Sequence, residues 1–221
     1  VHPDEVESDS IKISGLVCKK FSPNYSRKQG SGSLDQYFTD FHIVGISDID
    51  TRKLVAHLRE SGAQNAIISS EILDVEALKD ALKEVPDMSG VNLAPDVSTE
   101  KFYESIPENA AHRVALIDFG NKENISRELK KRGCHLGVFP HNTSAAEMMD
   151  WKPDGFMISN GPGDPASMTQ AIETVTTMVE AGIPTFGICL GHQLLSLASG
   201  LKTYKMHHGH RGCNHPVKNL V

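Results

Sequence analysis

From residue 113 onward, the chain alternates short apolar runs with helix-forming segments, and this alternation constrains the fold more strongly than any other feature. The apolar runs lie at 113–119, 134–139, 155–159, 184–188 and 201–206, and helices are expected at 124–132, 144–149, 167–181 and 190–199. The first run is almost continuous in apolar residues, as expected for a strand buried on both faces of a parallel sheet. This repetition predicts a flavodoxin-like, doubly wound α/β fold with its first four strands in the order 2-1-3-4, and with functional sites at the carboxyl ends of the strands.

The first half of the chain has a different pattern and is expected to form a separate α/β domain. Its expected elements are, in order, strand 11–20, helix 33–39, strand 42–47, helix 52–61, strand 66–69 and helix 74–84. Thr51 is the expected N-cap of the second helix. Residues 86–111 carry prolines, several acids and little periodicity, which favours an inter-domain connection. The predicted domains are therefore 1–110, including this linker, and 111–221.

Composition excludes several classes of protein. The 221 residues are 39% hydrophobic and 23% charged, which is ordinary for a soluble protein, and the net charge of -6 does not favour a nucleic-acid partner. No apolar run is long enough to span a membrane, and residues 1–10 are too acidic and polar for a signal peptide. The four cysteines are widely spaced without a C-x-x-C pair, which favours free thiols in a reducing compartment and predicts the cytoplasm.

A cysteine lies where the fourth run passes into a helix. Gly187 and Gly191 flank Cys189 two residues on either side, as in the G-x-S-x-G nucleophile elbow with sulfur in place of oxygen. Small residues allow a sharp turn, and the positive end of the following helix favours the thiolate. The alternative is a buried structural cysteine, which would be the better interpretation of a lone cysteine. The two glycines favour a nucleophile.

A second glycine-rich stretch, Ser159–Pro165, follows the third run with the sequence SNGPGDP. In the expected strand order this loop and the cysteine turn lie side by side. The amide of Leu190 and the amide of Gly161 or Gly163 could then form an oxyanion hole. An ordinary Gly-Pro turn is the alternative. A phosphate site is disfavoured, because the spacing is not G-x-G-x-x-G and no P-loop lysine follows.

These motifs carry a family resemblance. FGICLGHQLL at 186–195, together with SNGPGDP at 159–165, resembles the glutaminase domain of class I glutamine amidotransferases. ISDIDTRKL at 46–54, SGAQN at 61–65 and the tail at 205–219 resemble the small subunit of carbamoyl-phosphate synthetase. The resemblance covers essentially the whole chain.

The resemblance implies a mechanism and a partner. Cys189 would attack the side-chain amide of glutamine, forming a thioester and releasing ammonia. By the family pattern, Gly161, Gly163, Leu190 and Gln193 would hold the substrate or its oxyanion. Ammonia would pass to a large subunit that uses bicarbonate and ATP to make carbamoyl phosphate for arginine and pyrimidine synthesis. The resemblance thus implies a cytoplasmic heterodimer, with no cofactor in this chain, ATP and Mg²⁺ on the partner, and neither nucleic acid nor membrane as a partner.

One departure from the family affects catalysis. The family's general base is a histidine, oriented by a glutamate, downstream of the Asn-His-Pro segment at 214–216, and the sequence ends at Val221. We therefore expect an amidotransferase domain that is incomplete at its C-terminus, opening strands missing from the first domain, and little steady-state glutaminase activity from the chain as written. His192 is expected to have a packing or hydrogen-bonding role. Two alternatives stay open: a non-catalytic subunit acting as interface or scaffold, and a free-standing cysteine hydrolase.

Two other clusters have simpler interpretations. Five potential metal ligands lie within nine positions, namely His207, His208, His210, Cys213 and His215. Glycines interrupt the run, and the resembling family is metal-free, so we expect no metal site. Asp48 and Asp50 precede a helix and are expected to form a structural turn rather than a catalytic pair.

Overall fold

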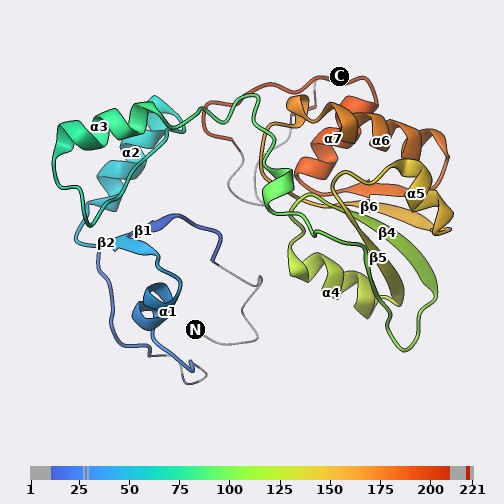
Figure 1. Cartoon of the computed structure of the whole chain (residues 1–221), viewed down its shortest axis with the longest axis horizontal. Helices are drawn as coiled ribbons and strands as arrows, with labels where there is room; N and C mark the ends of the chain where they lie inside the picture. The colour runs from blue at the N-terminus through green and yellow to red at the C-terminus, as the bar shows by residue number, and fades with distance from the viewer. Residues whose placement is uncertain (1–10, 27, 29, 210–217, 220–221) are drawn as a thin grey trace. The chain divides into compact units, whose positions relative to one another are not determined.

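The computed structural model describes residues 11–26, 28, 30–209 and 218–219. It contains two compact units, which are described separately (Figure 1). The first comprises residues up to Pro86 and from Tyr204 onward, and the second is Asp87–Thr203.

The second unit contains a five-stranded sheet in the order β3-β5-β4-β6-β7. The strands are β3 (Tyr103–Ser105), β4 (His112–Asp118), β5 (Cys134–Pro140), β6 (Gly155–Ile158) and β7 (Thr185–Gly187). The last four are parallel, and β3 pairs antiparallel with β5 at the edge. The predicted order 2-1-3-4 is confirmed, since it corresponds to β5-β4-β6-β7.

Helices cover both faces of this sheet. Figure 1 shows α4 (Glu123–Lys131) on one face and α5 (Ala145–Asp150), α6 (Thr169–Glu180) and α7 (Leu190–Ala198) on the other. Successive residues of β4 belong to different cores: Leu116 packs in the cluster that Ile125 and Leu129 of α4 join, whereas Ile117 packs with residues of α6 and α7. Successive side chains of a strand point to opposite faces, so a strand covered on both sides needs a continuous apolar run.

Residues 87–111 differ from the linker expected there. They contain the 3₁₀ turn η2 (Ala94–Asp96) and strand β3, and both lie within the second unit. Ala94 is fully buried, and Tyr103 pairs with Val138 of β5. This segment is held by single hydrogen bonds and one short strand pairing. Such interactions need no regular spacing of apolar residues, so the sequence pattern does not predict them.

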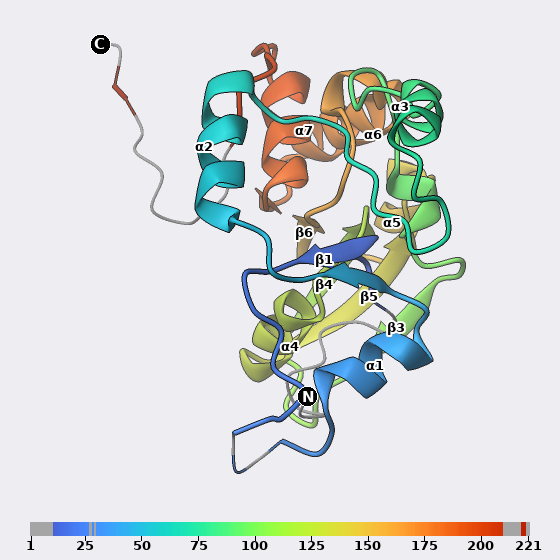
Figure 2. The same cartoon turned by 90° about the vertical axis from the view of Figure 1, so that its left-hand side faces the viewer.

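The described residues of the first unit form two short parallel strands and three helices. The strands are β1 (Gly15–Val17) and β2 (Val44–Ile46), which Figure 2 shows side by side. The helices are α1 (Leu34–Asp40), α2 (Thr51–Ser61) and α3 (Val75–Lys83), and none of their residues is fully buried. These helices therefore pack through partly buried side chains only.

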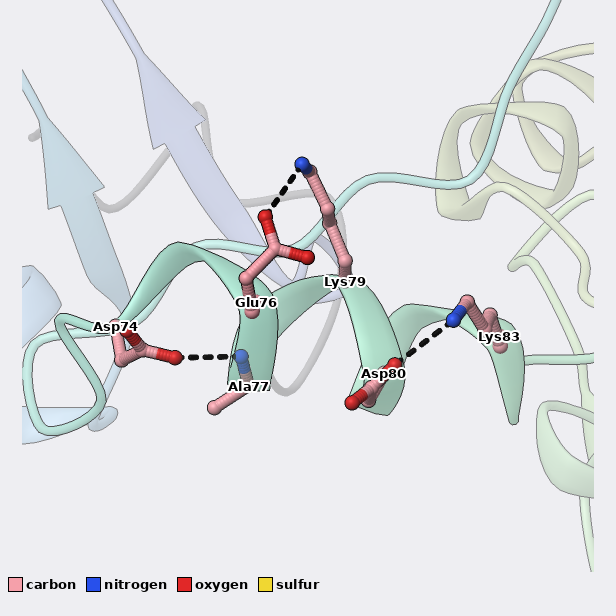
Figure 3. A network of polar contacts seen from close by, with 6 residues as sticks. All are labelled: Asp74, Glu76, Ala77, Lys79, Asp80 and Lys83. Atoms are coloured by element: carbon pink, nitrogen blue, oxygen red, sulfur yellow. Dashed lines mark hydrogen bonds and ion pairs between the residues drawn. The ribbon is translucent and has the colours of Figure 1, made fainter.

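Helix α3 also has polar interactions at its surface (Figure 3). Asp74 caps the helix by accepting a hydrogen bond from the backbone N–H of Ala77 at 2.8 Å. Ion pairs join Glu76 to Lys79 and Asp80 to Lys83, each at 2.8 Å. All four charged side chains are exposed, and such pairs contribute at most about 1 kcal/mol each.

Three expected local features are wrong. The N-cap of α2 is Asp50, whose carboxylate accepts from the N–H of Lys53 at 3.0 Å, and Thr51 is the first helical residue. Residues 66–69 and 201–206 do not form strands. A β-branched or apolar stretch needs a neighbouring strand to pair with, and neither stretch pairs with a described strand. Residues 201–206 instead span the boundary between the two units, at Thr203 and Tyr204.

Candidate active site

Cys189 lies in a sharp turn between β7 and α7. Its backbone has φ 54° and ψ −109°, in the region with positive φ that non-glycine residues rarely occupy, and the residue is exposed. The amide of Ile188 donates to the carbonyl of Ile158 at 3.0 Å, and that of Gly191 donates to the carbonyl of Ser159 at 3.1 Å. These bonds fix the turn to the end of β6, so the surrounding backbone holds the strained conformation of Cys189.

The two flanking glycines are required by close packing. A Cβ on Gly187 would lie 2.5 Å from the carbonyl carbon of Gly191, and a Cβ on Gly191 would overlap the carbonyl oxygen of Ile158. The first turn of α7 thus lies against the backbone at the end of β6. The sequence signal G-x-C-x-G therefore has a steric basis here.

The loop Ser159–Pro165 is anchored at its first two residues. The hydroxyl of buried Ser159 accepts from the N–H of Phe119 at 2.8 Å and donates to the carbonyl of Asn160 at 2.8 Å. The side chain of Asn160 accepts from the N–H of Lys122 and donates to the carbonyl of Gly120, both at 2.9 Å. The loop after β6 is therefore bonded to the turn after β4.

Gly161 brings this loop against the cysteine turn. A Cβ there would lie 2.8 Å from Cδ2 of Leu190 and would overlap the carbonyl oxygen of Phe119. Leu190 is buried and is the first residue of α7, so its backbone N–H has no acceptor within the helix. The loop and the cysteine turn therefore lie side by side, and the backbone N–H of Leu190 directly follows the exposed Cys189.

Gly163 lies further along the same loop. Its φ is +101°, and a Cβ would lie 2.9 Å from the carbonyl oxygen of Val91 and 3.0 Å from the amide nitrogen of Leu93. Both the dihedral angle and the lack of space require glycine. Of the two candidate oxyanion donors in the loop, Gly161 contacts the residue that follows Cys189, whereas Gly163 contacts residues 91–93.

The two polar residues after Leu190 are exposed. The backbone N–H of Gln193 donates to the carbonyl of Cys189 at 3.1 Å, so Gln193 lies one helical turn after the cysteine. His192 lies between them on α7, and among the described residues no hydrogen bond joins it to Cys189. The arrangement therefore includes a thiol, backbone donors and an amide side chain.

Sequence reasoning missed Asp118, at the carboxyl end of β4. Its carboxylate is buried and accepts from the N–H groups of Thr99, Gly120 and Asn121, at 2.7–2.8 Å. The available signal was an acid inside an apolar run, because a buried carboxylate requires partners. Asp118 fixes the turn on which Gly161 packs.

The pKa of Tyr103 in β3 is also affected by acidic residues at this end of the sheet. Partial burial raises the pKa of its hydroxyl, and the negative charges of Glu123 and Asp118 raise it further. The phenol therefore stays neutral over a wider pH range than a free tyrosine.

The described part of the chain contains neither a cluster of metal ligands nor a membrane-spanning helix. No group of three or more potential metal ligands lies together there. His210, Cys213 and His215 of the histidine-rich cluster fall outside the described residues, as does most of the tail at 205–219. None of the described helices is both long and apolar enough to cross a membrane.

Comparison with known proteins finds a matching family for each half of the chain. The family model for glutamine amidotransferase class-I matches residues 115–220, and that for the CPSase domain of the carbamoyl-phosphate synthase small chain matches residues 1–68. The second unit, with its cysteine turn, is thus an amidotransferase domain of class I.

Relatives that match along the whole chain identify the family more narrowly. The carbamoyl phosphate synthase small chains of Thioalkalivibrio sulfidiphilus, Chlorobaculum tepidum and Vibrio vulnificus are 42%, 43% and 45% identical to it, over 100%, 100% and 98% of its length. The chain belongs to the carbamoyl phosphate synthase small-chain family. It spans 62%, 61% and 62% of the lengths of these relatives.

Proposed function

We propose that the full-length protein hydrolyses glutamine as the small subunit of a carbamoyl-phosphate synthase, with Cys189 as its nucleophile. The observation that carries this proposal is the exposed thiol in a strained turn, at the start of α7 and beside the Gly161 loop. A cysteine with a purely structural role would be expected to be buried and to have an unstrained backbone, and Cys189 has neither property. Family membership supports glutamine as the substrate.

The proposed reaction proceeds in two steps. The thiolate of Cys189 bonds to the carboxamide carbon of glutamine, and the carbonyl π electrons move to the oxygen, where backbone N–H groups stabilise the charge. The C–N bond then breaks, the nitrogen takes up a proton, and ammonia leaves a thioester. Water attacks the thioester, the C–S bond breaks, and glutamate and the thiol are released.

The residues near Cys189 divide these tasks. The amides of Leu190 and Gly161 are the proposed oxyanion donors, with Gly163 as a further candidate, and Gln193 is a proposed substrate contact. His192 is exposed on α7, and the family resemblance gives it a packing or hydrogen-bonding role rather than that of the base. The base is therefore proposed to be a histidine that the family carries downstream of 214–216.

The product ammonia defines the proposed partner. It would pass to a large subunit that combines it with bicarbonate and ATP to give carbamoyl phosphate, the precursor for arginine and pyrimidine synthesis. ATP and Mg²⁺ are proposed to bind that subunit, since no motif in this sequence resembles a nucleotide site. The described cysteines Cys18, Cys134 and Cys189 are free thiols, which supports the cytoplasm as the location.

A glutaminase assay tests the proposal. Ammonia release from glutamine is measured with the full-length protein and with its Cys189→Ala and Cys18→Ala variants. We expect Cys189→Ala to lose at least about a thousandfold in rate, because the nucleophile is gone, and Cys18→Ala to keep wild-type activity. Equal release by the wild type and Cys189→Ala would overturn the assignment of the nucleophile.

A further inference from the structure

Residues 88–99, here called the edge segment, are bonded to the carboxyl ends of three strands. After β6, Gly90 donates its N–H to Asp164 at 2.9 Å. At the end of β4, Thr99 donates its N–H to Asp118 at 2.8 Å. After β5, the hydroxyl of Ser98 accepts from the N–H of His141 at 2.9 Å. The edge segment thus lies along the edge of the sheet that carries the candidate site.

Asp164 links the edge segment to the loop after β6 through two hydrogen bonds. Its Oδ2 accepts from the N–H of Gly90, and its own N–H donates to the carbonyl of Val91 at 2.9 Å. Its Oδ1 accepts from the N–H of Ala166 at 3.0 Å, which caps the 3₁₀ turn η3 (Pro165–Ser167). One carboxylate thereby bonds two separate backbone segments, and such charge-assisted bonds are stronger than neutral ones.

The two glycines that precede Asp164 in the loop pack closely against backbone carbonyl groups of two different segments. Gly161 lies against the carbonyl of Phe119, and Gly163 lies against the carbonyl of Val91 in the edge segment. A displacement of Val91 would free one side of the loop that carries the candidate oxyanion donors. Donors must lie within about 2.7–3.1 Å of the developing oxyanion to be effective, so small displacements reduce the rate.

We propose that Asp164 is a positioning residue for the reaction at Cys189, because it holds the edge segment against the Gly161–Gly163 loop and so fixes the backbone donors of the oxyanion hole. The inference rests on the proposed glutaminase function. Asp164 acts through the loop and does not contact the substrate. The edge segment is accordingly a part of the active site that contributes no catalytic group.

Asp164→Asn is the test variant, because asparagine keeps the size and one acceptor oxygen but loses one of the two side-chain bonds. Asp154→Asn is the matched control. Asp154 precedes β6, and its Oδ2 accepts from the N–H of Arg113 at 2.7 Å, near the start of β4 and hence at the opposite edge of the sheet. Both variants remove one carboxylate charge, but the remaining amide oxygen at position 154 can still accept from the N–H of Arg113, whereas position 164 loses one of its two acceptors.

Two reagents separate positioning from thiol reactivity in the full-length protein. A glutamine analogue with a chloromethyl ketone in place of the carboxamide needs the oxyanion hole to alkylate Cys189 rapidly. Iodoacetamide alkylates the thiol without that requirement. Modification of the Cys189 peptide is followed by mass spectrometry, and hydrogen exchange of residues 87–93 reports whether the edge segment is released.

We expect Asp164→Asn to slow alkylation by the ketone at least about tenfold, with the iodoacetamide rate within about twofold of wild type and faster exchange at 87–93. Asp154→Asn should match the wild type with both reagents. The inference is overturned if Asp164→Asn reacts with the ketone at the wild-type rate, or if both variants lose reactivity equally. Failure of the ketone to label wild-type Cys189 would overturn the proposed function itself, and this inference with it.

A second variant covers the case in which Asp164→Asn does not fold. Ser98→Ala removes a different anchor of the edge segment and leaves Asp164 in place. It should also slow the ketone selectively, by about threefold or more, because the same segment loosens. If the ratio of the ketone rate to the iodoacetamide rate in Ser98→Ala equalled that of the wild type, the proposed role of the edge segment would be contradicted.

Discussion

At the scale of single residues, the conformation of Cys189 is the central feature. A non-glycine residue with φ 54° is strained, by about 1–3 kcal/mol, and persists only where neighbours fix it. Here the neighbours are backbone groups of Ile158 and Ser159, which approach closely because residues 187 and 191 are glycines. These backbone contacts around Gly187 and Gly191 hold the turn in which the thiol of Cys189 is exposed.

The same reasoning predicts the effect of a methyl group at Gly161. Gly161→Ala would place Cβ against the carbonyl oxygen of Phe119, so the loop must move away from Leu190. We expect the free energy of unfolding of the second unit to fall by about 1–3 kcal/mol, and glutaminase activity to fall at least about tenfold. Chemical denaturation and the ammonia assay measure the two effects.

Gly182→Ala is the control for Gly161→Ala. Gly182 has φ +69°, but a Cβ there meets no atom within 4 Å. Only the conformational cost of about 1–2 kcal/mol should appear, with activity preserved. If both variants kept full activity, the loop would not depend on close approach at Gly161.

At the scale of elements, helix α5 shows how a short helix is stabilised by its first turn. Ser144 accepts from the N–H of Glu147 at 3.3 Å, while the carboxylate of Glu147 accepts from the N–H of Ser144 at 3.0 Å. This reciprocal arrangement is a capping box. The backbone and hydroxyl donors of Ser144 lower the pKa of Glu147.

The lowered pKa of Glu147 gives a pH dependence with a defined sign. Folding favours the charged carboxylate, so its contribution to stability is complete above the pKa of an unfolded glutamate and is lost as the pH falls through the lower, folded pKa. Glu147→Gln should therefore lower Tm at neutral pH and have a smaller effect in acid. Thermal unfolding across this pH range measures it, with Glu173→Gln on α6 as control. A Tm difference that did not shrink with acid would contradict the prediction.

The elements also show what sequence patterns can and cannot predict. The parallel strands β4 to β7, their order and the helices around them follow from apolar runs such as the one that includes Leu116 and Ile117, because burial dictates the residue types. The closeness of the Gly161 loop and Cys189 follows from that order. The roles of Asp118 and Asp164 do not follow, because they depend on hydrogen bonds to residues 90–99, distant in sequence and without periodicity. Residues 201–206 are predicted to form a strand because they are apolar, but they have no partner strand among the described residues.

At the scale of the whole molecule, a small-chain domain and an amidotransferase domain occur in one chain. From the proposed function we expect full-length Cys189→Ser protein, combined with the proposed large subunit, to support carbamoyl-phosphate synthesis from ammonia but not from glutamine. The glutamine-dependent rate should fall at least about a thousandfold, because only the thioester step is lost, with the ammonia-dependent rate near wild type. Loss of both rates would show that Cys189 is needed for more than hydrolysis.

The antiparallel strand β3 has a consequence for folding. It pairs with β5 through Tyr103, Glu104 and Ser105 and so occupies hydrogen-bonding groups at one border of the sheet. Without these residues, an amidotransferase domain that began at β4 would present the unpaired edge of β5, and exposed strand edges template association between chains. We therefore expect a fragment that begins before β3 to associate less than one that begins at β4, because β3 covers part of the edge of β5.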